Sequence, residues 1–239
     1  MPDVLIDAHV HLRPGEGARG VLLQAAERMA AQGGAGAICV TMLAEQPRCD
    51  AFEQMRAEGA QTAEAESLWI GPLLLIAGRQ VVSAEGIEIL AQATSARFDD
   101  GAPARRMLSA MARADALTTL PWGVGKWLGR RGRLVDELLA ADGEGRLLLG
   151  DNGGRPGWWR ESRFAGRIVL RGSDPLPIAG DERRIGAFGS VLNGEISRDR
   201  PAADLRALIR SLDRLPASFG RCVSPLRFVS NQLRLRMAA

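Results

Sequence analysis

Tyrosine is absent from this 239-residue chain, and histidine occurs only at His9 and His11. Because the two histidines share one tripeptide, a serine or cysteine catalytic triad would have to take its base from that tripeptide. The three cysteines, Cys39, Cys49 and Cys222, are odd in number and lack the C-x-x-C spacing. This pattern argues against a disulfide framework and a thiolate zinc site, and it predicts reduced thiols.

Long apolar runs are also missing. The longest, such as Leu68 to Ala77, fall well short of the roughly 20 residues that span a bilayer. The chain does not begin with the basic segment that opens a signal peptide, so we expect a cytoplasmic protein with no membrane partner. Lys and Arg number 31 and Asp and Glu number 28, which gives a net charge of +3. Because these basic residues are spread among acidic ones, no nucleic-acid partner is expected.

The chain does contain an alternation of short apolar runs with segments of helical spacing. Predicted strands are 4–6, 37–42, 68–76, 117–120, 146–149, 167–170 and 186–192, with one or two more in 79–90; predicted helices are 18–32, 50–65, 105–114, 126–140 and 201–212. This order is typical of βαβ units and predicts an α/β fold, a TIM-like (β/α) barrel of seven or eight mostly parallel strands, regular or distorted. We expect one domain over 1–239, with 217–239 as a C-terminal extension in which 226–237 forms a final strand or an arginine-rich tail.

The histidines directly follow the buried run Val4 to Ile6. Residues i and i+2 of a strand point the same way, so His9 and His11 can offer two imidazoles to one metal ion. The segment Asp7 to Gly15, DAHVHLRPG, resembles the opening of the amidohydrolase superfamily, especially its dihydroorotase and allantoinase branch. The resemblance continues through Ala25 to Pro47 and implies a barrel whose first strand ends in a metal-binding HxH pair.

A second match to the same superfamily is Gly172-Ser173-Asp174-Pro175, after the predicted strand 167–170. The resemblance implies that Asp174 binds the metal and accepts a proton from its water, whereas a turn or helix cap is the alternative. No third histidine is present, so the family's binuclear site cannot be assembled, and phosphoesterases of the PHP type need still more histidines. The site that remains is His9, His11 and Asp174 around one divalent ion, with zinc favoured.

Other polar residues follow predicted strands and form a candidate substrate site. Lys126 is the single lysine beside 30 arginines, which suggests amine chemistry such as carboxylation or a covalent step, unless it is an ordinary surface lysine. Asp151 and Asn152 follow strand 146–149, either as ligands or as part of a glycine-rich turn. Arg13 and Arg155, together with Lys126, would bind an anionic group.

These features predict a metal-dependent hydrolase of a small-molecule C–N or ester-type bond, in which Asp174 and Lys126 are catalytic. The alternative is a catalytically degenerate amidohydrolase-like barrel that serves as a binding or scaffold protein, and the missing histidines favour it. A third hypothesis, nucleic-acid binding through the arginine-rich tail, predicts a steep salt dependence of affinity. A homo-oligomer is compatible with the sequence.

Overall fold

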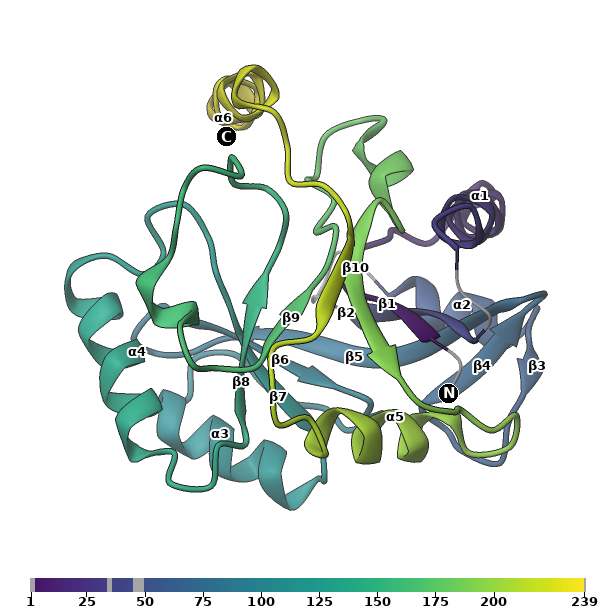
Figure 1. Cartoon of the computed structure of the whole chain (residues 1–239), viewed down its shortest axis with the longest axis horizontal. Coiled ribbons are helices and arrows are strands. Elements are labelled where there is room, and N and C mark those ends of the chain that lie inside the picture. The colour runs from purple at the N-terminus through teal and green to yellow at the C-terminus, as the bar shows by residue number, and fades with distance from the viewer. Residues whose placement is uncertain (1–2, 34–35, 45–49, 239) are drawn as a thin grey trace.

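A computed structural model of the chain describes residues 3–33, 36–44 and 50–238 (Figure 1). The strands are β1 (Asp3–Val10), β2 (Ile38–Ala44), β3 (Ala60–Gln61), β4 (Ser67–Ile70), β5 (Leu73–Val82), β6 (Glu88–Gln92), β7 (Leu117–Pro121), β8 (Leu147–Asp151), β9 (Val169–Arg171), β10 (Phe188–Asn193) and β11 (Ala217–Gly220). The helices are α1 (Ala18–Ala30), α2 (Ala51–Arg56), α3 (Ala104–Arg113), α4 (Gly129–Ala141), α5 (Pro201–Arg210) and α6 (Pro225–Ala238), with 3-10 turns η1 (Ser162–Phe164) and η2 (Asp181–Arg184).

The strands form one mixed sheet that curls into a nearly closed barrel. Its order is β11-β10-β1-β2-β5-β6-β7-β8-β9, with β3 and β4 attached beside β5. The curl closes where the Arg171 N–H donates to Ser190 Oγ. This hydrogen bond links β9, at one end of the strand order, to β10, the strand next to the other end. The α/β class and the barrel shape agree with the sequence expectation. The expectation of mostly parallel strands is wrong, because the sheet contains both parallel and antiparallel pairs. Strands β6 and β10 run antiparallel to both of their neighbours. The connection from β5 to β6 is a short turn, whereas α3 lies between β6 and β7 and α5 lies between β10 and β11.

The barrel interior is filled by apolar side chains that alternate along the strands. In β1, Val4 and Ile6 face a buried cluster that also holds residues of β5, β7, β8 and β9, whereas Leu5 faces a cluster on the outside. Helix α5 contributes Leu205 and Ile209 to the interior cluster and covers the lower end of the barrel in Figure 1. The opposite end, where β1, β8 and β9 finish, is left for polar groups.

Two further clusters bury the outer faces of the sheet. One packs α1 and α2 against β1, β2 and β5, and the other packs α3 and α4 against β6, β7, β8 and β9. Each helix presents one apolar stripe, as in α1, where Leu22, Ala25 and Met29 recur at helical spacing and are fully buried. The strands are therefore buried on both sides, as expected from their continuous apolar runs.

The predicted strand 68–76 is wrong, because the chain forms a hairpin there. Gly71 and Pro72 separate β4 from β5, which pair antiparallel in register from Ser67 with Ile76 to Ile70 with Leu73. Gly71 has φ +57°, a conformation that glycine adopts without steric cost. β5 then continues to Val82, through part of the stretch where separate short strands were expected.

Other boundaries also differ from the sequence expectation. The helix predicted over 50–65 ends at Arg56 and is followed by β3, and the helix predicted from Lys126 begins at Gly129. The segment 226–237, expected as a strand or tail, lies in helix α6, while β11 pairs with β10. A single domain with an extension at 217–239 stays a prediction. Cys49 and the end of the family-like stretch at Pro47 lie outside the described residues. In the described part of the chain, no helix has the length and apolar character needed to cross a membrane.

Candidate metal centre

His9, His11 and Asp174 meet at the upper end of the barrel. Each offers one ligand atom, and the three atoms lie within 4.8 Å of one another. His9 Nε2 is 3.1 Å from His11 Nε2 and 3.4 Å from Asp174 Oδ1. Two ligands that each lie about 2.0–2.1 Å from one ion are about 2.9–3.4 Å apart when the angle at the ion is about 90–110°. The donor atoms therefore fit a single metal ion, and the set of two imidazoles and one carboxylate leaves positions for water or substrate.

A β-bulge in β1 turns the histidines toward the site. Asp7 pairs with Val40 and Val10 pairs with Met42. Between these two pairs, β1 advances by three residues and β2 by two, so β1 contains one extra residue. The extra residue reverses the alternation: Val10 faces the outer cluster that Leu5 also faces. His9 and His11 are thereby directed to the barrel mouth. In a regular strand they would point to the same side as Leu5, which is the outer side of the sheet.

The carboxylate of Asp7 ties the strand end to the loop that carries Asp174. Its Oδ1 accepts the backbone N–H groups of Ser173 at 2.8 Å and His9 at 3.3 Å, and its Oδ2 accepts that of Gly186 at 2.7 Å. Burial raises the pKa of Asp7 to about 6, although these hydrogen bonds lower it. Both oxygens of the Asp7 carboxylate accept backbone N–H groups, so Asp7 positions the segments that carry the candidate ligands. The family-like stretch 7–15 includes Asp7, but the sequence reasoning assigned it no role.

Gly172 allows this loop to lie directly on β1. A Cβ at position 172 would be 2.5 Å from His9 Cβ and 2.8 Å from His9 Cα, closer than side-chain atoms approach one another. Two residues later, the Asp174 N–H donates to the carbonyl of His9 at 2.8 Å. Asp174 itself has φ +40°, an uncommon value for a residue with a side chain. The two segments that carry the candidate ligands are thus joined through the backbone.

Asn152 holds the Asp174 carboxylate in place. Its Nδ2 donates to Asp174 Oδ2 at 2.8 Å and to the Trp122 carbonyl at 3.0 Å. Burial raises the pKa of Asp174, but the charges of His9, His11 and Lys126 and the Asn152 hydrogen bond outweigh burial and lower it overall. Asp174 is therefore an anion at neutral pH, with Oδ1 directed to the histidines. The sequence reasoning placed Asn152 near the site, as a substrate-binding residue.

His9 is in the protonation state that a metal requires. Burial lowers the pKa of His9 to about 4, against the opposing effect of the Asp174 carboxylate, so the imidazole is neutral at pH 7. His11 Nδ1 is buried and has no hydrogen-bond partner among the residues described, so the His11 ring is oriented mainly through its contacts with His9. Both Nε2 atoms point to the same place, where an ion would replace the contact between them.

Asp151 and Arg155 lie beside this centre but are committed to each other. The guanidinium of Arg155 donates to both carboxylate oxygens of Asp151, at 3.0 and 2.6 Å, and Asp151 is buried. The Asp151 carbonyl also accepts the Gly172 N–H at 3.0 Å. The pair stabilises the loop after β8, and neither charge is directed at the three-ligand cluster.

A pocket of about 630 Å³ opens over the three candidate ligands. It is lined by His11 and Asp174 and by residues of the α1 entry and the 175–182 loop. Arg13 and Lys126 also line it, and Lys126 Nζ lies 2.5 Å from both carboxylate oxygens of Glu88. Gln80 and Glu88 were missed by the sequence reasoning, because the stretch 79–90 holds several polar residues and nothing in its sequence shows which of them face the barrel mouth.

Comparison with known proteins finds solved structures of similar fold, but it does not assign the chain to a family. No protein-family model matches the sequence, and neither does any curated protein. The solved structure of PsfC from Pseudomonas syringae PB-5123 is similar over 100% of this chain and 99% of its own, with a TM-score of 0.60 and 14% identity. The endonuclease PfuEndoQ from Pyrococcus furiosus, described as lesion-specific, is similar over 90% of this chain, with a TM-score of 0.57 and 13% identity.

A structure of Endonuclease Q in complex with a 27-mer duplex substrate, with an abasic lesion at the active site, is also similar. Its TM-score is 0.55 at 14% identity, over 88% of this chain. This chain spans 57% of the length of each endonuclease chain that it matches. At these identities the likeness shows the fold alone.

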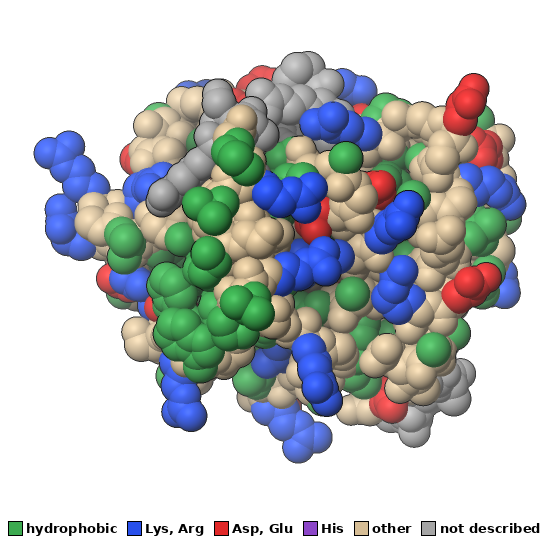
Figure 2. Space-filling view, turned by 90° about the horizontal axis from the view of Figure 1, so that it is seen from above, with side chains coloured by type: hydrophobic (Ala, Val, Ile, Leu, Met, Phe, Trp, Pro, Cys, Tyr) green, Lys and Arg blue, Asp and Glu red, His purple; other side chains and the backbone are tan. Residues whose placement is uncertain are grey.

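The resemblance to the amidohydrolase superfamily is wrong, because PsfC and Endonuclease Q are among the structures similar to this one and no family model matches. An HxH pair at the end of a strand is a local arrangement of ligands that can occur in sheets of different topology, so it does not identify a family. The expected small-molecule substrate and the absence of a nucleic-acid partner are also wrong, since a neighbour of the same fold holds a nucleic-acid duplex as its substrate. The even spread of basic residues along the sequence concealed their arrangement in space, and Figure 2 shows many Lys and Arg side chains on the upper face.

Proposed function

We propose that this protein is a metal-dependent hydrolase that cleaves phosphodiester bonds in nucleic acid. The observation that carries the proposal is the convergence of His9, His11 and Asp174 at the pocket. Their donor atoms have the spacing of ligands to one ion, and the ring of His9 is neutral at pH 7. Zinc is the first candidate, because two imidazoles and one carboxylate with an open position form a common catalytic zinc site.

The residues of the chain have separate roles in this proposal. A bound divalent ion would polarise the phosphate and lower the pKa of water. His9 and His11 would hold the ion through their imidazole nitrogens, and Asp174 would hold it through its carboxylate and accept a proton from the attacking water. Asn152 keeps the carboxylate in this orientation. Arg13, at the pocket rim, contacts the anionic backbone of the substrate.

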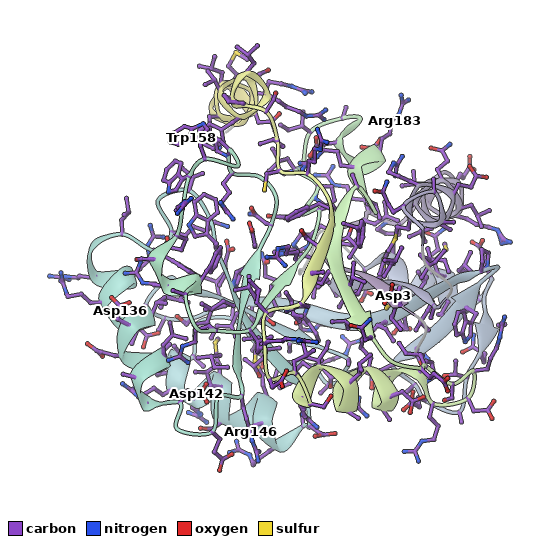
Figure 3. The ribbon with its side chains drawn as sticks, viewed as in Figure 1. Asp3, Asp136, Asp142, Arg146, Trp158 and Arg183 are labelled. Atoms are coloured by element: carbon purple, nitrogen blue, oxygen red, sulfur yellow. The ribbon has the colours of Figure 1, made fainter. Side chains whose placement is uncertain are left out.

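Three observations support nucleic acid as the substrate. Endonuclease Q holds a 27-mer duplex with an abasic lesion at its active site, and it shares this fold. In this protein, Lys and Arg side chains gather on the upper face shown in Figure 2. Trp158 is 71% exposed and stacks on Trp159 beside α6, on the same upper side of the molecule (Figure 3). Basic groups beside an exposed aromatic ring suit a polyanion with stacked bases.

The proposal is tested by incubating the purified protein with end-labelled DNA that is single-stranded, duplex, or duplex with an abasic site. Each substrate is assayed with Zn²⁺, Mn²⁺ or Mg²⁺ and with a chelator. We expect strand cleavage that requires a metal and falls at least about 100-fold in His9→Ala and Asp174→Asn. Asp136→Asn, which alters an exposed carboxylate of α4 that pairs with Arg163, is the matched control and should cleave like the parent.

Cleavage that persists in both ligand variants would come from another site or a contaminant and would refute the proposal. Metal and DNA binding without any cleavage would instead support the alternative of a catalytically degenerate barrel that acts as a binding protein. Equilibrium binding of the labelled DNA, measured on the same samples, separates this outcome from a protein that does not bind nucleic acid at all.

A further inference from the structure

Lys126 and Glu88 form an ion pair on the wall of the pocket that opens over the candidate metal ligands. Lys126 Nζ lies 2.5 Å from both Oε1 and Oε2 of Glu88, so the ammonium sits across the carboxylate rather than at one corner of it. Glu88 is the first residue of β6, and Lys126 lies in the loop after β7. Because β6 is antiparallel to β7, the start of one and the end of the other lie at the same end of the barrel.

This ion pair belongs to the same cavity as the candidate metal ligands. Lys126, Glu88, His11 and Asp174 all line the pocket. A fixed positive charge therefore lines the same pocket as the residues that would hold an ion.

Gly123 leaves room for the Lys126 side chain. A Cβ at position 123 would overlap the side chain of Lys126 and would lie 2.9 Å from its Cε and its Cγ. Glycine at this position lets the lysine stem lie along the loop, and the Lys126 N–H donates to the Gly123 carbonyl at 3.0 Å. An ammonium is a compact point charge, closer in shape to a bound ion than the planar guanidinium that the other 30 basic residues carry.

We propose that the Lys126 ammonium, held by Glu88, occupies the position of a second metal ion, so that the centre takes one divalent ion and one built-in cation. This inference rests on the proposed function, because it assigns the second positive charge that would face a phosphodiester at the same site. Many phosphate-cleaving sites use two metal ions about 3.5–4 Å apart to balance the charge of the attacking and leaving oxygens. Here the ammonium supplies one of those charges, and Glu88 is the carboxylate that would otherwise bind a cation.

The proposal predicts the number of ions bound, independently of activity. Metal-free protein is titrated with Mn²⁺ by isothermal titration calorimetry, and bound Mn²⁺ is counted by electron paramagnetic resonance. The parent should bind one Mn²⁺ per chain, and Lys126→Ala should bind two, because removal of the ammonium leaves the Glu88 carboxylate free to bind an ion. Lys126→Ala combined with Glu88→Gln should return to one, as should Lys126→Arg, which restores a cation.

The matched control is Arg146→Ala, which removes the cation of an exposed ion pair with Glu144 at the lower end of the molecule (Figure 3). It should bind one Mn²⁺. If Lys126→Ala does not fold, as judged by circular dichroism, Lys126→Met keeps the apolar stem and takes its place. One Mn²⁺ in the parent and also in the lysine variants would overturn the inference and leave the proposed function intact, as would two in the parent. No Mn²⁺ in the parent would refute the proposed function itself.

Discussion

At the scale of single residues, the candidate centre depends on side chains that position the ligands as much as on the ligands themselves. Asp7 and Gly172 hold the two ligand-bearing segments together, and Asn152 fixes the carboxylate of Asp174. Groups that orient ligands commonly affect metal affinity almost as strongly as the ligands do. Two of these residues can be tested without changing a ligand.

Asn152→Ala removes the hydrogen bond to Asp174 Oδ2 and leaves the three ligands unchanged. We expect the dissociation constant for Zn²⁺ to rise by about 10–100-fold, because the carboxylate is no longer held toward the histidines. Competition with a chromophoric chelator measures this constant. Asn193→Ala, which removes an exposed amide at the end of β10 that bonds to Asp3, should leave it unchanged. Equal affinities in the two variants would show that Asn152 does not orient the ligand.

Gly172→Ala places a methyl group against the backbone of His9. We expect a loss of about 1–3 kcal/mol in the free energy of unfolding, because the loop must move away from β1. Metal affinity should fall as well, since the same loop carries Asp174. Gly143→Ala, at an exposed glycine whose Cβ would meet no atom within 4 Å, is the control. Urea denaturation of both variants compares them, and similar stabilities would contradict the close approach.

At the scale of secondary-structure elements, β1 has two functions along its length. Its first half is a buried strand whose Val4 and Ile6 fill the barrel interior. Its second half, after the bulge between Asp7 and Val10, turns the histidines to the mouth. Bulges are frequent next to functional sites, because one extra residue redirects every side chain that follows it.

The buried half of β1 should be sensitive to lost volume. Ile6→Ala should cost about 2–4 kcal/mol, because the interior is packed from several strands and from α5 and cannot collapse into the cavity. Val82→Ala, at the partly exposed end of β5, should cost less than about 1 kcal/mol. Chemical denaturation with a common slope measures both values. A small loss for Ile6→Ala would mean that β1 does not form part of the core.

At the scale of the whole molecule, closure of the sheet brings distant segments to one face. The Asp151 carbonyl accepts the Gly172 N–H, and the His9 carbonyl accepts the Asp174 N–H, so the ends of β8, β9 and β1 are joined. Helix α5 covers the other end of the barrel (Figure 1). One end is therefore apolar and closed, whereas the other carries the ligands, the pocket and many basic side chains (Figure 2).

This asymmetry predicts a salt dependence of nucleic-acid binding. The logarithm of the binding constant for a duplex DNA should fall linearly with the logarithm of salt concentration, because each phosphate contact releases counterions. Arg183→Ala, on the upper side in Figure 3, should reduce the slope by about 1. Arg146→Ala, at the lower end, should not change it. Fluorescence anisotropy at several salt concentrations measures the slopes, and identical slopes for both variants would exclude Arg183 from the interface.

The sequence alone determined the local features of this protein. Apolar runs and helical spacing predicted most strands and helices, including β1, α1, α3, β7 and α5, because these patterns reflect burial on known faces. The i, i+2 spacing and the strand-end location of His9 and His11 predicted that both imidazoles face one way. Asp174 was added to this pair only through the family resemblance that proved wrong, although the structure does bring the three residues together. These signals reside in a few adjacent residues.

Only the tertiary structure decided how these local pieces are assembled. The hairpin at Gly71, the antiparallel course of β6 and β10, and the bulge in β1 depend on pairing between distant segments, which hydrophobic patterns do not encode. The same holds for the pairing of Asp151 with Arg155 and for Glu88 beside Lys126, since each charge selects its partner by proximity in the folded chain. A family resemblance based on residues 7–15, 25–47 and 172–175 could not specify the remaining strands, because strand order and direction are set by contacts across the whole sheet.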